Sequence, residues 1–233
     1  MSTTEPRAGT ALEPLAAGQR MTRAEFHDRY EAIPPGTTFE LIDGEVHMAS
    51  PVSGEHSDSC GLASGWLGYY AFRTPGVRVG HDGSLLLSDE AEVQPDLMLR
   101  IDPRRGGQTR REGLYIAGCP ELVIEVALSS RAIDLGPKLA EYDRAGALEY
   151  VVFALEPDAI HWHARRDGRL IRVEPDPDDL YRSAAFPGLW LDPAAWHAND
   201  GPGLVPALDR GLATPEHAAF VARLAAHLFE GDR

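Results

Sequence analysis

The alternation of apolar and polar positions predicts several helices. Thr22 and Glu25 form a capping-box signal ahead of apolar residues at helical spacing, which indicates a helix that ends at the Pro-Pro-Gly of residues 34–36. Residues 56–72 repeat apolar side chains with a helical period, so a helix with one buried face is predicted, its aromatic residues in the core. Further helical segments are predicted at residues 138–142 and from Thr214 onward.

Apolar runs bounded by turn residues predict strands, several of them joined as hairpins. Asp43-Gly44 is a strong two-residue turn signal between two short runs. His81-Asp82-Gly83 and Asp167-Gly168 indicate two further hairpins. The predicted strands are residues 39–42, 45–48, 77–79, 84–87, 148–155, 160–164 and 170–173.

Two other apolar runs each contain an acid. Residues 93–99 place Asp96 directly after a proline, and residues 121–127 place Glu125 among β-branched residues. Acids are depleted from strands and are rarely buried without a partner, so each one needs a reason. Taken one at a time, each acid has a structural explanation: Asp96 could cap a turn and Glu125 could pair with an arginine. The presence of both acids in apolar runs, followed by Lys138, favours a functional site.

Two carboxylates and an ammonium are the groups that a metal-dependent phosphodiesterase needs. If the two strands are neighbours, their acids can hold one Mg²⁺ together with water and phosphate oxygens. Such an ion polarises a phosphodiester and lowers the pKa of the attacking water. Lys138 would stabilise the charge on the phosphate or orient the nucleophile. The pattern therefore predicts phosphodiester hydrolysis.

The charge balance argues against tight, non-specific binding to nucleic acid. The 233 residues include 36 acids and 22 lysines and arginines, a formal net charge of -14. Five arginines nevertheless gather in the Pro/Gly-rich segment 100–111, directly after the strand predicted to carry Asp96. We expect this loop to clamp substrate phosphates, the alternative being a solvated loop. The substrate-binding residues are then Arg104, Arg105, Arg110 and Arg111.

An ordered series of motifs resembles the Uma2 family (DUF820) of restriction endonuclease-like proteins, within the PD-(D/E)xK nuclease superfamily. The resemblance runs from about Thr22 to about Leu191. Its motifs are FELIDGE at 39–45, QPD at 94–96, LVIEV at 122–126 with Ser129 and Ser130, Asp134 through Lys138 to Tyr142, Gly146, and EYVV at 149–152.

The resemblance implies roles for individual residues. Asp96 and Glu125 would be ligands of Mg²⁺ (or Mn²⁺), with the carbonyl of Val126 as a further ligand. Lys138 would be the catalytic lysine, although the superfamily pattern places it two residues after the second acid, at the position of Ala127. The lysine has then moved onto the following helix. The same resemblance implies an additional catalytic acid, Glu45 or, as the alternative, Glu40.

The same resemblance implies the fold and the assembly. We expect an α/β protein with a restriction-endonuclease-like mixed central sheet flanked by helices, with peripheral β-hairpins. The predicted organisation is a flexible N-terminal segment at 1–20, a nuclease domain at 21–192, and a linker with a C-terminal helix at 193–233. A homodimer that cuts both strands of DNA is expected.

Other features limit the location and the chemistry. Residues 1–20 lack a signal-peptide pattern and no apolar stretch is long enough to cross a bilayer, so a cytoplasmic protein is expected. Cys60 and Cys119 are interpreted as buried thiols. His161 and His163 favour a half-exposed edge strand over a zinc pair, and the role of His56 stays open.

Two alternatives to a DNA endonuclease remain. The strong negative charge would suit a non-catalytic binding or assembly module that keeps the nuclease fold. It would equally suit a phosphodiesterase that acts on a smaller substrate, for which an acidic surface is less of a handicap.

Overall fold

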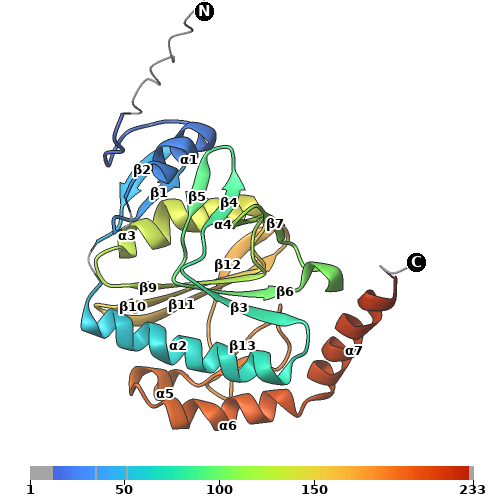
Figure 1. Cartoon of the computed structure of the whole chain (residues 1–233). Coiled ribbons are helices and arrows are strands. Elements are labelled where there is room, and N and C mark those ends of the chain that lie inside the picture. The colour runs from blue at the N-terminus through green and yellow to red at the C-terminus, as the bar shows by residue number, and fades with distance from the viewer. Residues whose placement is uncertain (1–12, 35, 51, 231–233) are drawn as a thin grey trace, which may run out of the picture.

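The structure is a computed structural model that describes residues 13–34, 36–50 and 52–230, with side chains up to His227. Within these residues the chain has a mixed α/β fold, with two six-stranded sheets, a two-stranded hairpin and flanking helices (Figure 1). This is the predicted fold class. None of the described helices is both long and apolar enough to cross a membrane.

The central sheet has the strand order β12-β11-β10-β9-β6-β3. Strands β9 and β10 pair in parallel, and the other described neighbours in this sheet pair antiparallel. Every residue of β9 is buried, which explains why all of them except Glu125 are apolar. The strands are β3 (Val77–His81), β6 (Leu97–Ile101), β9 (Leu122–Ala127), β10 (Glu149–Leu155), β11 (Asp158–Arg166) and β12 (Arg169–Val173).

The second sheet has the order β2-β1-β5-β4-β8-β7 and faces the central sheet across α4 (Figure 1). Its turn between β1 and β2 has positive φ at Asp43 (52°) and Gly44 (71°), as the predicted two-residue hairpin requires. The strands are β1 (Phe39–Ile42), β2 (Glu45–Met48), β4 (Leu85–Ser88), β5 (Ala91–Val93), β7 (Arg110–Glu112) and β8 (Tyr115–Ala117).

Helices cover both faces of the central sheet. Helix α2 packs Trp66, Leu67 and Tyr70 against one face, and α6 lies against the outer side of α2 (Figure 1). The other face carries α4, which ends at Gly146 with a φ of 91°. The helical elements are α1 (Arg23–Glu31), α2 (Gly54–Arg73), the 3₁₀ turn η1 (Pro103–Arg105), α3 (Arg131–Ile133), the π-helical turn η2 (Asp134–Lys138), α4 (Leu139–Ala145), α5 (Pro193–His197), α6 (Gly201–Leu212) and α7 (Pro215–Glu230).

Several predicted elements are confirmed with close boundaries. Thr22 caps α1 by accepting a hydrogen bond from the backbone N–H of Glu25. The predicted helix at 56–72, the strand at 148–155 and the hairpin around Asp167-Gly168 correspond to α2, β10 and β11–β12. Cys60 and Cys119 are free and buried, as interpreted.

The hairpin predicted around residues 81–83 is wrong. Strand β3 pairs with β6 in the central sheet, whereas β4 pairs with β5 and β8 in the second sheet. Asp82 does turn the chain with a φ of 49°, but the turn passes the chain between two sheets. Turn chemistry is local, and pairing partners are decided by the whole fold.

Three other expectations differ from the structure. Strand β11 is an interior strand rather than an edge strand, so His161 and His163 are buried. The predicted linker 193–213 forms α5 and α6, because capping aspartates precede prolines that suit the first helical turn. Of the N-terminal segment predicted to be flexible, residues 1–12 lie outside the described residues, while Leu15 is buried and Arg20 forms a bridge to β2. The remaining short hairpin consists of β13 (Tyr181–Arg182) and β14 (Trp190–Leu191).

Candidate active site

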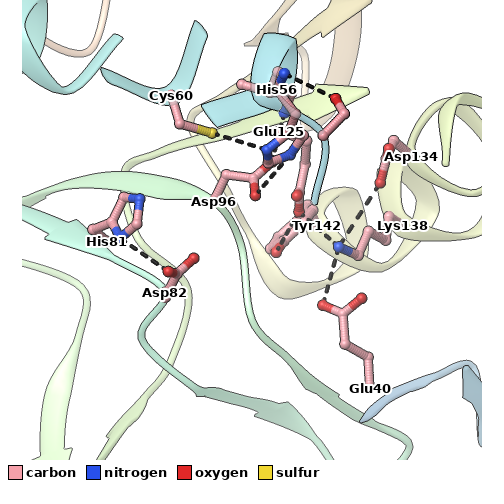
Figure 2. Close-up of polar contacts among 12 residues, drawn as sticks. Glu40, His56, Cys60, His81, Asp82, Asp96, Glu125, Asp134, Lys138 and Tyr142 are labelled. Carbon is pink, nitrogen blue, oxygen red and sulfur yellow. Dashed lines mark hydrogen bonds and ion pairs between the residues drawn. The ribbon is translucent and has the colours of Figure 1, made fainter. Parts of the chain in front are cut away.

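A cavity of about 210 Å³ opens where the two sheets meet the start of α2 and the π-helical turn η2. Five charged side chains line it, two of them from η2, and Figure 2 shows how they converge. These are Glu40, Asp96, Glu125, Asp134 and Lys138. The cavity therefore contains four carboxylates and one ammonium within a small volume.

Asp96 lies between the sheets rather than within a strand. The run expected as a single strand at 93–99 breaks after β5, and β6 begins only at Leu97. The pairing of β6 with β9 stops at Leu97 and Ile124, because Pro95 has no N–H to continue the ladder. The Oδ2 atom of Asp96 instead accepts a hydrogen bond of 2.7 Å from the backbone N–H of Val126. The carboxylate is thus held against the open end of β9.

Glu125 lies on β9, on the face that α4 and η2 cover. Its Oε1 atom accepts hydrogen bonds from Lys138 Nζ at 3.0 Å and from the Tyr142 hydroxyl at 3.4 Å. Burial, together with the nearby carboxylates Asp134, Asp96 and Glu40, raises the pKa of Glu125 well above its usual range, against the opposing effect of Lys138. Such a carboxylate has excess affinity for a cation.

Lys138 ends the π-helical turn, whose widened backbone contains Pro137. Its Nζ atom lies 3.0 Å from both Glu125 Oε1 and Glu40 Oε1, and 3.8 Å from Asp134 Oδ1. Burial alone would lower the pKa of Lys138, but these three carboxylates raise it well above its ordinary value. The ammonium therefore stays charged in the interior.

The structure places Glu40, and not Glu45, in this cluster. Glu40 lies on β1, an interior strand, where it contacts Lys138 and accepts a hydrogen bond of 2.7 Å from the N–H of Gln94. Glu45 lies on the edge strand β2, is 42% exposed and pairs with Arg20 at 3.4 Å. Glu45 therefore lies outside the cluster, because strand position, rather than proximity in sequence, decides which acid reaches the cavity.

The arginine loop does not lie beside the cavity. Asp96 precedes β6 and the loop follows it, so the length of the strand, roughly 15 Å, separates them. In Figure 1 the loop after β6 lies toward α7, and Arg105 donates a hydrogen bond of 3.2 Å to the carbonyl of Leu224. The other three arginines have nearby partners: Asp102 for Arg104, Glu112 for Arg110 and the carbonyl of Gly113 for Arg111. The loop therefore does not lie next to the proposed metal ligands, and binding of phosphates by its arginines stays a prediction.

Two residues without an assigned role from sequence also belong to the cluster. Asp134 is buried, and its Oδ2 atom has no hydrogen-bond partner among the described residues. Tyr142 supports Glu125 from one turn beyond Lys138. The signal that would have found both is their spacing, because Asp134, Lys138 and Tyr142 follow each other at intervals of four on one helical face.

His56 and Cys60 approach Asp96 from the first turns of α2. The His56 Nε2 atom lies 3.3 Å from Asp96 Oδ1, and the His56 Nδ1 atom lies 3.5 Å from Cys60 Sγ (Figure 2). The hydrogen bond to Asp96 raises the pKa of His56, and burial raises the pKa of Cys60 to about 12. In the described structure the thiol is therefore protonated at neutral pH.

The carboxylates and a backbone carbonyl provide oxygen ligands suited to a hard cation. A strand residue points its N–H and C=O toward the same neighbour, so the Val126 carbonyl faces the side of the sheet where Asp96 accepts the Val126 N–H. The unpartnered Asp134 oxygen adds a buried acceptor in the same cavity. Oxygen ligands of this kind suit Mg²⁺ or Mn²⁺. The residues present therefore fit such an ion.

Known proteins resemble this chain in both fold and sequence. The chain is similar to a solved structure described as a putative nuclease belonging to DUF820 from Anabaena variabilis, with a TM-score of 0.57 and 15% sequence identity. The match covers 74% of this chain and 97% of the other. No curated protein matches the sequence. The model of the Uma2 family, described as "Putative restriction endonuclease", matches residues 23–194. This match covers most of the chain, which therefore belongs to the Uma2 family.

Proposed function

We propose that the protein is a divalent-metal-dependent endonuclease that hydrolyses phosphodiester bonds in DNA. The observation that carries the proposal is the convergence of Asp96, Glu125 and Lys138 on one cavity, with the ammonium 3.0 Å from the Glu125 carboxylate. The Uma2 family is described as "Putative restriction endonuclease" and the similar protein from Anabaena variabilis as a "putative nuclease", which supports the same activity.

Asp96, Glu125 and the carbonyl of Val126 would hold Mg²⁺ or Mn²⁺. When bound, the ion supplies Lewis-acid activation of the phosphate and a water of lowered pKa. The protein contributes the position of each oxygen: the N–H of Val126 fixes the Asp96 carboxylate, and Tyr142 and Lys138 fix the Glu125 carboxylate.

Lys138 would stabilise the negative charge that develops on the phosphate oxygens. The surrounding carboxylates keep its ammonium charged, and Glu40 and Asp134 restrain its position. Glu40 thus acts as a positioning residue, held in turn by the N–H of Gln94. This arrangement lets a single ammonium serve both as a structural partner and as an electrostatic catalyst.

The assembly and location are proposed on the same basis. Cutting both strands of a duplex needs two sites, so we expect a homodimer. The two free cysteines suit a reducing compartment, which favours the cytoplasm.

The test is cleavage of supercoiled plasmid and of single-stranded DNA with Mg²⁺, Mn²⁺ or EDTA. We expect cleavage by the wild type with a metal, and a loss of about a hundredfold or more in Glu125→Gln and Lys138→Ala. Glu45→Gln is the matched control, because this acid lies outside the cluster, and its activity should equal that of the wild type.

Activity that is equal in all three variants would contradict the assignment. If the wild type cleaves no polymer, short dinucleotide phosphodiesters test the smaller-substrate alternative. If the wild type also fails to bind Mn²⁺ in a calorimetric titration, a non-catalytic binding module is favoured.

A further inference from the structure

A second set of metal-ligand atoms lies on the α2 side of Asp96. His56 and Cys60 are four residues apart, so they share one face at the start of α2. One ligand atom from each of His56, Cys60 and Asp96 can be chosen such that all three atoms lie within 4.8 Å of one another (Figure 2). His56 and Cys60 come from α2, and Asp96 comes from the connection between β5 and β6.

The three residues are close enough to surround a single tetrahedral ion after a small rearrangement. Ligand atoms bonded to zinc at about 2.0–2.3 Å lie roughly 3.3–3.7 Å from one another. The 3.3 Å contact from His56 Nε2 to Asp96 Oδ1 falls in this range, whereas the 3.5 Å contact with Cys60 Sγ is made by the other ring nitrogen, Nδ1, and is not a spacing around the same ion. The imidazole now directs one nitrogen to each partner. A rotation of its side chain would let all three residues share one ion.

The ligand chemistry differs on the two sides of Asp96. Toward β9 the available atoms are oxygens of Glu125 and Val126, which suit a hard cation. Toward α2 they are an imidazole and a thiol, which favour Zn²⁺ and disfavour Mg²⁺. His56 and Asp96 line the cavity while Cys60 is buried behind them, so a fourth position would open into the cavity.

We propose that His56, Cys60 and Asp96 form a zinc-binding site that competes with the proposed nuclease site for Asp96. On binding, Zn²⁺ replaces the proton of the Cys60 thiol, which passes to solvent, and a Zn–S bond forms. Because an Asp96 bound to zinc is no longer available to the hard cation, zinc would inhibit cleavage. The binding claim stands without the proposed function, and only the inhibition rests on it.

The surroundings of the cluster supply further negative charge. Asp82, at the turn after β3, lies close enough for its charge to act on both His56 and Cys60. His81 pairs with Asp82 at 3.0 Å. A divalent ion at the cluster would therefore lie among groups with an excess of negative charge.

The first experiment measures binding alone, by titrating the purified full chain with Co²⁺ in the absence of DNA. We expect one tight Co²⁺ per chain with the near-ultraviolet absorption of a thiolate-to-cobalt bond, abolished by one equivalent of Zn²⁺. Cys60→Ala and Cys60→Ser should lose this absorption and bind Zn²⁺ at least about tenfold more weakly. Cys119→Ala is the matched control, because Cys119 is the other buried cysteine and should leave the spectrum unchanged.

The absorption persisting in both Cys60 variants, or its absence in the wild type, would overturn the site. Circular dichroism and a thermal melt identify a variant that has failed to fold. If Cys60→Ala does not fold, the absorption of the more conservative variant Cys60→Ser tests the site. The comparison between Cys60 and Cys119 makes the result independent of any DNA cleavage.

The second experiment adds Zn²⁺ to Mg²⁺-dependent plasmid cleavage. We expect inhibition of the wild type and, in Cys60→Ala, unchanged basal cleavage with at least about tenfold less sensitivity to Zn²⁺. Equal inhibition of both proteins would refute the competition. A wild type that cleaves no DNA but gives the thiolate–cobalt spectrum would refute only the proposed function, so the two failures are distinguishable.

Discussion

Lys138 is the only lysine in the chain, among 22 basic residues. The other residues counted as basic are arginines, so the cluster contains the chain's one side-chain ammonium group. A compact ammonium can direct its protons to Glu125, Glu40 and Asp134 from one point, whereas a planar guanidinium would need more space. At the residue scale, the site therefore depends on a side chain that arginine cannot replace.

Replacing Lys138 with alanine should destabilise the fold as well as remove activity. The change leaves the buried carboxylates of Glu125 and Asp134 and the partly buried carboxylate of Glu40 without their cation, and the free energy of unfolding should fall by about 3 kcal/mol. Urea unfolding measures the difference. Arg110→Ala is the control, because the side chains of Arg110 and its partner Glu112 are 69% and 50% exposed, and this ion pair should contribute less than about 1 kcal/mol. Similar losses in both variants would refute the structural role of Lys138.

Replacing Asp134 with asparagine should separate stability from metal binding. Burial raises the pKa of Asp134 despite the opposing effect of Lys138, and its Oδ2 atom has no hydrogen-bond partner in the part of the chain that the structure describes. Removing this charge should raise the free energy of unfolding by about 1 kcal/mol in the metal-free protein. Affinity for Mn²⁺ should fall roughly tenfold if the oxygen contributes to the ion. Calorimetry and urea unfolding test both, and a fall in both quantities would contradict the interpretation.

At the scale of elements, single polar side chains tie distant segments to the central sheet. Glu149 on β10 is fully buried among apolar residues and accepts hydrogen bonds from the Ser183 hydroxyl and the N–H of Ala184. These bonds attach the segment before β14 to the sheet. Burial nevertheless raises the pKa of Glu149 to about 7, above its ordinary value of 4.5.

The stability of this attachment should depend on pH. Because the folded state binds the proton of Glu149 more tightly, its contribution is fully present below pH 4.5 and is lost as the pH rises through about 7. The free energy of unfolding of the wild type should fall between pH 4.5 and pH 8. In Glu149→Gln, which cannot ionise at this position, the fall should be smaller by about 3 kcal/mol. Denaturant curves at several pH values measure this difference. Parallel pH profiles for the two proteins would refute it.

At the scale of the whole molecule, the C-terminal helices belong to the main core although they lie beyond the family match. Tyr69 on α2 donates a hydrogen bond to Asp209 on α6, and Thr74, directly after α2, forms a hydrogen bond with His217 on α7. Phe220 and Leu224 of α7 lie in the same hydrophobic cluster as the central sheet. One folding unit is therefore expected to extend beyond residue 194.

Truncating Phe220 to alanine should cost about 3–4 kcal/mol, because its ring is 2% exposed and packs against Phe186. Unfolding should remain a single transition when followed by both tryptophan fluorescence and circular dichroism. Phe72→Ala is the control, since Phe72 is 90% exposed. Two separate transitions would show that the C-terminal helices form an independent unit.

Helices and hairpin turns could be predicted from the sequence, whereas the pairing of distant strands could not, and the difference has a physical reason. Periodicity and turn residues are local, so α1, the β1–β2 hairpin and α2 were predicted from sequence with close boundaries. Which strands pair depends on contacts between segments far apart in the chain, and the incorrect β3–β4 hairpin shows this limit. Capped helices rich in Gly and Pro, such as α6, resemble loops by composition alone.

The sequence by itself determined the type of chemistry available: two acids in apolar runs, one lysine and a set of elements typical of an α/β nuclease fold. Only the tertiary structure decided that Glu40 and not Glu45 reaches Lys138, and that the arginine loop lies at the far end of β6. It also brought His56 and Cys60 to Asp96. Spacing along the chain sets which face a side chain occupies, whereas strand order and helix packing set which faces meet.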